Sequence, residues 1–158
     1  MAKPLIYVET TVISYQASRP SRDVVIAGHQ AVTAQWWESD LPKFAPVVSQ
    51  VVLDEISSGD PDAVAKRLAL VRGMDVLEMT GEVQSLAIEY FEGIALPETA
   101  RADALHLAMA TWHGVDYLTR WNCRHIASAR VRQVVQQINE RRGLATPVIC
   151  TPEELLEY

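Results

Sequence analysis

The sequence predicts an α/β domain in which a mainly parallel sheet of about four to five strands lies between two layers of helices. Short apolar runs rich in β-branched residues alternate with longer stretches of helical periodicity, which is the order typical of parallel sheets. The chain contains neither internal repeats nor a linker that would mark a boundary. Its 158 residues, 49% of them apolar, therefore predict one domain over residues 1–158.

The first elements are marked by composition and by capping residues. Pro4–Val8 is a short apolar run, as expected for a buried strand. Thr10 and Thr11 supply hydroxyls that cap a turn or a helix start. Residues 23–39 carry apolar side chains along one side at helical spacing, which predicts a helix.

The middle of the chain repeats the alternation. Residues 44–48 form a second predicted strand, and Ser49 caps the helix that follows it. Asp60 and the proline after it open another helix, because proline lacks an N–H group that the first helical turn does not need. Residues 75–79 are a third predicted strand, and Thr80 starts a helix that runs to about residue 91.

The C-terminal part contains the strongest helical pattern. Residues 98–113 are rich in alanine and leucine, and Gly114 ends the predicted helix. Residues 115–119 predict a fourth strand, residues 128–142 a helix, and residues 147–150 a last strand before a closing helical turn. In such parallel sheets, functional residues gather beyond the carboxyl ends of the strands.

The charge distribution is uneven. The net charge of −6 argues against a nucleic-acid-binding protein. From residue 104 to residue 150, however, only Asp116 and Glu140 are acidic. Six arginines lie in that stretch: Arg120, Arg124, Arg130, Arg132, Arg141 and Arg142. The stretch is equally compatible with contacts to a phosphate backbone and with a solvated helix face.

Cysteine usage and hydropathy favour a cytoplasmic protein. Cys123 and Cys150 match neither a zinc-binding spacing nor a secreted disulfide framework, which predicts reduced thiols. The sequence shows neither a signal peptide nor an apolar stretch of about 20 residues that would span a membrane.

Acidic and amide side chains follow several of the predicted strands. Glu9 comes directly after the first strand, where capping of the next helix is an equal alternative to a functional role. Glu55 lies early in a helix, and for it alone interaction with the helix dipole is the favoured role. Asp103 lies among small apolar residues and does not face Arg101, which favours a functional role. Asn122 offers an amide oxygen to a hard cation.

These residues fall in four segments that together resemble the motifs of PIN domains. The segments are 7–14 (YVETTVIS), 49–56 (SQVVLDEI), 102–108 (ADALHLA) and 118–122 (LTRWN). Their order and spacing match the PIN pattern from about residue 4 to residue 150. Within that class the chain looks most like the VapC-type toxins of prokaryotic type II toxin–antitoxin systems.

The resemblance implies a three-layer α/β/α PIN-like fold and a Mg²⁺- or Mn²⁺-dependent endoribonuclease that cuts RNA internally. It further implies a homodimer that a small antitoxin protein silences. The implied metal ligands and catalytic residues are Glu9, Glu55, Asp103 and Asn122. Thr10 and Thr119 would support these ligands, and Arg120 and Arg124 would contact RNA phosphates, with a solvated edge as an equal alternative for the two arginines. His106 and His113 are expected at polar edges of the core.

Two departures from the family pattern keep an alternative open. Glu9 stands where aspartate is usual, and Asn122 stands where aspartate is common. The alternative is a catalytically silent PIN scaffold that binds RNA or a partner protein. A receiver-like or phosphatase domain is disfavoured, because it needs an aspartate at the position of Glu9.

Overall fold

The computed structural model describes residues 2–122 and 124–157. Its centre is a sheet of five strands, all parallel, in the order β3-β2-β1-β4-β5. The strands are β1 (Leu5–Val8), β2 (Ala45–Ser49), β3 (Asp75–Leu77), β4 (Tyr117–Thr119) and β5 (Val148–Cys150). The predicted parallel sheet is therefore confirmed, and each predicted strand forms within or close to its expected bounds.

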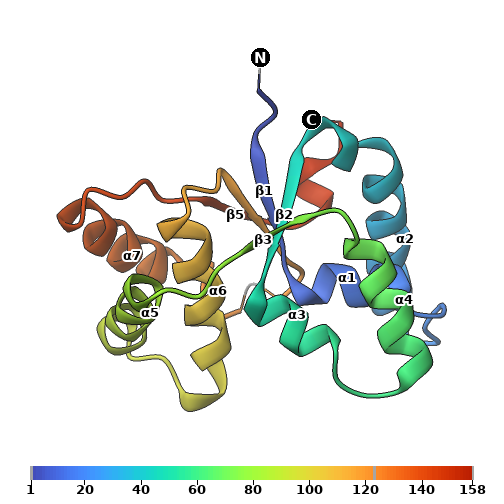
Figure 1. The fold of residues 1–158 in the computed structure, drawn as a ribbon, viewed down its shortest axis with the longest axis horizontal. Coiled ribbons are helices and arrows are strands. Elements are labelled where there is room, and N and C mark those ends of the chain that lie inside the picture. The colour runs from blue at the N-terminus through green and yellow to red at the C-terminus, as the bar shows by residue number, and fades with distance from the viewer. Residues whose placement is uncertain (1, 123, 158) are drawn as a thin grey trace.

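The α-helices form two groups, one on each side of the sheet (Figure 1). One group contains α1 (Thr10–Ala17), α2 (Val24–Ser39), α3 (Gln50–Ile56) and α4 (Pro61–Val71). The other contains α5 (Gly81–Ile94), α6 (Arg101–Trp112) and α7 (Ala129–Arg141). Three short 3₁₀ turns complete the described elements: η1 (Leu41–Lys43), η2 (Glu98–Ala100) and η3 (Glu153–Leu155). The predicted three-layer arrangement is confirmed.

Two helices differ from their predicted bounds. The helix predicted over residues 98–113 begins as the separate turn η2, and the α-helix α6 starts only at Arg101. The helix predicted to end near residue 91 continues to Ile94 and is terminated by Ala95, which adopts the left-handed conformation with φ of 55°. A non-glycine residue in that conformation gives little sequence signal of a helix end.

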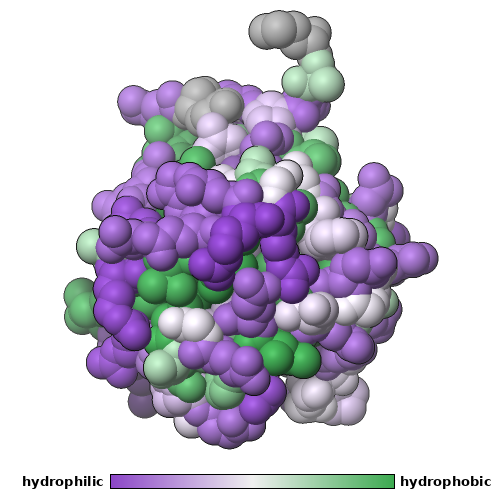
Figure 2. All heavy atoms as spheres, turned by 90° about the vertical axis from the view of Figure 1, so that its left-hand side faces the viewer, coloured by the Kyte–Doolittle hydropathy of each residue, from purple (hydrophilic) through white to green (hydrophobic). Residues whose placement is uncertain are grey.

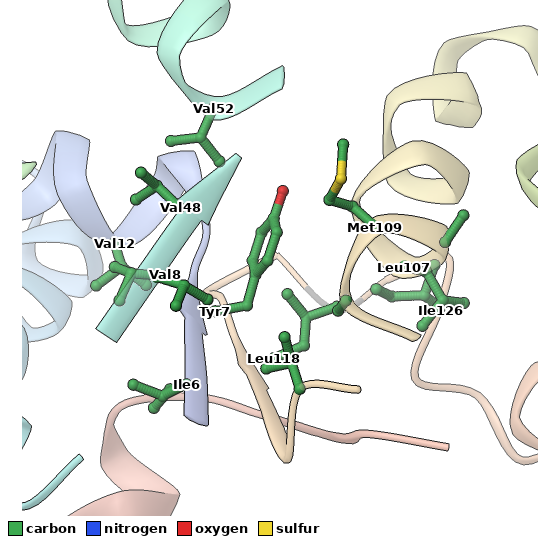
Figure 3. Close-up of a cluster of buried hydrophobic side chains, with 14 of the residues drawn as sticks. Ile6, Tyr7, Val8, Val12, Val48, Val52, Leu107, Met109, Leu118 and Ile126 are labelled. Atoms are coloured by element: carbon green, nitrogen blue, oxygen red, sulfur yellow. The ribbon is translucent and has the colours of Figure 1, made fainter. Parts of the chain in front are cut away.

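The central strand β1 is buried on both of its faces. Ile6, Tyr7 and Val8 are each 0% exposed, because helices cover both sides of the sheet. All three belong to the buried cluster that also contains Leu118 of β4 and Met109 of α6, and the Tyr7 side chain points toward Met109 (Figure 3). This packing fixes the position of the residue that follows β1.

The order of the strands reverses at β1: the strands that follow it are added first on one side of β1 and then on the other. From β1 the order continues to β2 and β3 on one side, and to β4 and β5 on the other. The pairing of β1 with β4 extends past the strands, because the backbone N–H of Glu9 donates to the Thr119 carbonyl at 3.1 Å. Open α/β sheets hold their ligands in the crevice at such a reversal, beyond the carboxyl ends of the strands.

The outer face of α5, α6 and α7 is mainly hydrophilic, with apolar side chains gathered in a smaller hollowed area (Figure 2). A groove between α5 and α6 is lined by Ala87, Ile88, Phe91, Ala104 and Leu105 together with Gln84 and Arg101. Among the described residues, none of the helices combines the length and the apolar character that crossing a membrane would require.

Candidate metal centre

Glu9 is held at the carboxyl end of β1 by the start of the next helix. Glu9 is 3% exposed, and its Oε2 accepts hydrogen bonds from the Thr11 backbone N–H at 3.1 Å and from the Thr11 hydroxyl at 2.6 Å. Glu9 is therefore the N-cap of α1, which confirms the capping role that the sequence left open for it, and the helix begins at Thr10. Its other oxygen, Oε1, is directed toward His106, 3.7 Å from Nε2.

Glu55 approaches the same point from α3. The Thr10 hydroxyl donates to its Oε1 at 2.9 Å, and the Nε2 atom of His106 lies 2.6 Å from the same oxygen. Partial burial raises the pKa of this carboxyl group, but His106, the Thr10 hydroxyl and Arg120 have the opposite effect. The net pKa lies below the ordinary value. Glu55 is thus a carboxylate over the neutral pH range.

His106 lies between these carboxylates and a buried phenol. Its imidazole is 1% exposed, and its Nδ1 is 2.7 Å from the hydroxyl of Tyr7. The Tyr7 hydroxyl is also 2.6 Å from the Ser49 hydroxyl, which accepts the backbone N–H of Val52 and so caps α3. Burial raises the pKa of Tyr7 far above its ordinary value, and the negative charges of Glu9 and Glu55 raise it further. Tyr7 is therefore a neutral phenol.

The expectation that His106 is only a polar edge of the core was incomplete. The ring is buried, as expected, but its Nε2 faces two of the predicted metal ligands. The sequence did contain a signal: Asp103 and His106 are three positions apart in a helix and so lie on the same face. Histidine with carboxylates on neighbouring elements is a donor combination found in many metal sites.

Asp103, which is partly buried, forms an ion pair with the buried Arg120. The Arg120 Nη2 donates to the Asp103 Oδ1 at 2.7 Å, and its Nε lies 3.8 Å from the Glu9 Oε2. Arg120 is 3% exposed, so the alternative of a solvated edge is wrong for this residue. The reason is topological: Arg120 follows β4 directly beside Glu9, and its side chain enters the acidic cluster.

Three other predicted site residues lie outside these contacts. Asn122 is exposed, and its Oδ1 accepts the backbone N–H of Arg124 at 3.2 Å. Arg124 is exposed as well, consistent with either of its two expected roles. Thr119 is buried, and its Oγ1 makes no hydrogen bond within the described part of the chain. The sequence prediction of Asn122 as a metal ligand therefore rests on the PIN-like motif alone.

Much of the arginine-rich stretch contacts the chain itself. Arg142 forms an ion pair with Glu89 at 2.7 Å, and Arg141 approaches the same carboxylate at 3.6 Å. Arg130 donates to the carbonyl of Ile94, and Arg132 to that of Ala127. The ion pairs with Glu89 and the burial of Arg120 reduce the positive charge available to a phosphate backbone, whereas Arg130 and Arg132, which contact neutral carbonyl groups, keep theirs.

The cluster suits a divalent cation. Glu9, Glu55 and His106 each offer one ligand atom, and these three atoms lie within 4.8 Å of one another. The three carboxylates of Glu9, Glu55 and Asp103 and the guanidinium of Arg120 sum to a charge of −2 when His106 is neutral. One divalent cation would balance that charge, and hard cations prefer carboxylate oxygens.

Comparisons with known proteins support the fold. Neither a protein-family model nor a curated protein sequence matches the chain. Its structure is similar to a chain of the VapBC2 complex of Rickettsia felis, which was crystallised bound to a DNA fragment from the promoter of that pair. The two chains superpose with a TM-score of 0.55 at 12% sequence identity, over 93% of this chain and 98% of the other. The chain has a PIN/VapC-like α/β fold.

Proposed function

We propose that this protein is a metal-dependent endoribonuclease that acts as the toxin of a toxin–antitoxin pair. The observation that carries the proposal is the convergence of Glu9, Glu55 and Asp103 beyond the carboxyl ends of the strands of a VapBC-like fold. Carboxylates held in one crevice repel one another unless a cation joins them. Their shared position therefore supports a site built for a divalent metal ion.

Mg²⁺ or Mn²⁺ is the proposed cofactor, and Glu9 and Glu55 are its proposed ligands, with Asp103 and Asn122 in supporting positions. These residues would hold an ion that, when bound, would supply Lewis-acid activation of a phosphodiester and of water. The chain's own residues prepare the site. The hydroxyls of Thr10 and Thr11 orient the carboxylates of Glu55 and Glu9.

RNA is the proposed substrate, by resemblance to the VapC-type toxins. Arg124 is exposed close in sequence to the cluster, and we assign it a contact to an RNA phosphate. Likeness to a VapBC complex also supports a small antitoxin as the partner. A homodimer and a cytoplasmic location complete the proposal.

A catalytically silent PIN scaffold that binds RNA or a partner protein is the second candidate. The burial of Arg120 favours it, because this guanidinium already supplies a positive charge to Asp103 and approaches Glu9. The exposed position of Asn122 also favours the silent scaffold. Its side-chain oxygen accepts the backbone N–H of Arg124, and a scaffold without catalysis does not need this residue as a fourth metal ligand.

Cleavage of RNA separates the two candidates. Purified protein, shown to be folded and free of other proteins, is incubated with a cellular RNA pool in Mg²⁺, Mn²⁺ or EDTA. Asp103→Asn is the test variant because its amide can still accept a hydrogen bond from Arg120. Asp62→Asn, at an exposed position in the first turn of α4, is the control.

The nuclease proposal expects cleavage by the parent and by Asp62→Asn in either metal, no cleavage in EDTA, and a loss of at least about 100-fold in Asp103→Asn. Equal cleavage by parent and Asp103→Asn would locate the activity elsewhere. Absence of cleavage by a folded parent in both metals would favour the silent scaffold.

A further inference from the structure

We propose that His106 is a nitrogen ligand of the metal ion, beside Glu9 and Glu55, and that the site therefore prefers transition-metal ions to Mg²⁺. The inference rests on the proposed metal site and deepens it, since the resemblance to PIN domains implied oxygen ligands only. It is carried by the placement of the His106 ring and by the ion pair that engages Asp103.

The imidazole is oriented with Nε2 toward the carboxylates. On its opposite side, Nδ1 lies 2.7 Å from the Tyr7 hydroxyl, and Tyr7 and Ser49 are both fully buried. A histidine that binds a metal through one ring nitrogen usually has its other ring nitrogen held by a hydrogen-bond partner of this kind. The Tyr7 oxygen can accept a hydrogen bond from Nδ1–H while its own hydroxyl donates to Ser49, so the site can hold the neutral tautomer whose Nε2 lone pair is free to bind a cation.

The Nε2 atom is buried and lacks a hydrogen bond of normal geometry to any residue that the structure describes. The nearest acceptor is Glu55 Oε1 at 2.6 Å, with Glu9 Oε1 at 3.7 Å. Two carboxylates therefore face this nitrogen, and its short contact with Glu55 lacks the geometry of a normal hydrogen bond, which is an arrangement that a shared cation would satisfy.

Asp103 is less available than His106 to bind the ion. Its Oδ1 accepts the 2.7 Å hydrogen bond from Arg120, and this pair is electrically neutral by itself. The remaining donors are two carboxylates and one neutral imidazole, whose charge a divalent ion balances. An imidazole ligand shifts the metal selectivity of the site toward Co²⁺, Ni²⁺ and Zn²⁺, whereas sites with oxygen ligands alone favour Mg²⁺ and Mn²⁺.

The competing explanation is that His106 only forms an ion pair with Glu55 and never binds a metal. The two explanations differ in whether a nitrogen nucleus lies in the first coordination sphere. Paramagnetic Mn²⁺ reports this directly, because a bound imidazole nitrogen modulates its electron spin echo. The modulation changes when the histidines carry ¹⁵N in place of ¹⁴N.

The experiment adds one equivalent of Mn²⁺ to the full chain and records bound Mn²⁺ and its nitrogen modulation. His106→Gln is the test variant. His113→Gln is the matched control, since His113 lies near the end of the same helix with its Nε2 2.9 Å from the Glu78 carbonyl. We expect ¹⁴N modulation in the parent and in His113→Gln, a ¹⁵N pattern after labelling, and neither in His106→Gln.

Mn²⁺ that binds to the parent without nitrogen modulation would overturn the assignment of His106 and leave the proposed carboxylate site intact. Modulation that persists in a folded His106→Gln would overturn it as well. A parent that binds neither Mn²⁺ nor Co²⁺ would remove the metal premise of both proposals. A parent spectrum without modulation is decisive by itself, whereas modulation in the parent is assigned to His106 only when the folded His106→Gln variant lacks it.

Metal preference provides a second readout that needs no RNA. Co²⁺ and Mg²⁺ each compete for the site against Mn²⁺, and the ratio of their affinities is compared between variants. We expect the preference for Co²⁺ over Mg²⁺ to fall by more than about tenfold in His106→Gln and to be unchanged in His113→Gln. An unchanged ratio in His106→Gln would contradict a nitrogen ligand.

Discussion

The guanidinium of Arg120 donates to the carboxylate of Asp103 at 2.7 Å in a site where both side chains are largely shielded from water. The arginine side chain is 4% exposed and that of the aspartate 14%. A positive charge is thus built into an acidic cluster, so the cluster can fold before any metal ion arrives. The pair also leaves Glu9, Glu55 and His106 to face one another.

Removal of this internal cation should destabilise the protein. Arg120→Met keeps much of the side-chain volume but leaves Asp103 as a buried charge without its partner, which costs about 3–5 kcal/mol. We expect the free energy of unfolding in urea to fall by that amount in EDTA. Because the variant then depends more on an added cation, Mn²⁺ should stabilise it more than it stabilises the parent.

Arg124→Met is the control for that measurement, because Arg124 is exposed and its change should leave unfolding within about 0.5 kcal/mol of the parent. If Arg120→Met and the parent had the same free energy of unfolding, the ion pair between Arg120 and Asp103 would contribute nothing to stability.

Thr11 connects Glu9 to the chain after β4. Its hydroxyl donates to the Glu9 Oε2 at 2.6 Å and accepts the backbone N–H of Trp121 at 3.0 Å. Thr11→Val has the same shape but leaves both groups without this partner, so we expect a loss of about 1–3 kcal/mol in chemical denaturation. Thr10→Val, whose hydroxyl contacts the more exposed Glu55, should lose less stability. The reverse order would contradict this account.

A buried phenol on the other side of the sheet gives a prediction at alkaline pH. Tyr90 donates to the Oδ1 of Asn139, and both residues are 0% exposed. Tyr90→Phe leaves that oxygen unsatisfied, and we expect a loss of about 1–3 kcal/mol at neutral pH. Burial raises the pKa of Tyr90 from 10.0 to about 12 in the folded chain.

The pH dependence of that difference has a defined sign. Below pH 10.0 the phenol is neutral in both states, so its stabilising effect is complete. As the pH rises toward 12, the unfolded chain releases the proton first and the advantage of the parent over Tyr90→Phe should shrink. Urea unfolding of both proteins at pH 8, 10 and about 11 measures this; a constant difference would argue against the raised pKa.

Asp40 should give the opposite pH dependence. Hydrogen bonds from Lys43 and Ser39 lower the pKa of its buried carboxyl group in the folded chain. The ionised form therefore stabilises the fold above the ordinary pKa of aspartate, and this stabilisation is lost as the pH falls through the lowered value. The parent should exceed Asp40→Asn in thermal stability at pH 7 and lose that advantage in acid. An advantage that persists at pH 2 would contradict the lowered pKa.

Local signals in the sequence were sufficient for most of the fold. Ser49, Asp60 and Thr80 begin helices as expected, because a side chain that caps a helix acts on N–H groups two or three residues away. The five strands were recognisable as short apolar runs, and their regular alternation with helices is characteristic of a parallel sheet. The left-handed Ala95 was not foreseen, because alanine gives no signal of that conformation.

The candidate site was predictable only in part. Asp103 was favoured as a functional residue because of its apolar surroundings, whereas Glu9 and Glu55 were assigned as ligands only through the resemblance to PIN motifs. The burial of Arg120 was not foreseen, since it depends on β4 lying beside β1 rather than on any neighbour in the sequence. The contacts of His106 likewise depend on how α6 meets α3 and β1 across the sheet.

The central position of β1 determines when the acidic cluster can assemble during translation. The backbone N–H of Glu9 donates to the carbonyl of Thr119, and the hydroxyl of Thr11 accepts the backbone N–H of Trp121, which lies 110 positions later in the chain. Contacts this distant in the chain close slowly and only after the later segment is available. A nascent chain therefore lacks the assembled cluster until β4 and the residues directly after it have been translated, and a truncated product that ends before β4 would carry Glu9, Glu55 and Asp103 without the assembled site.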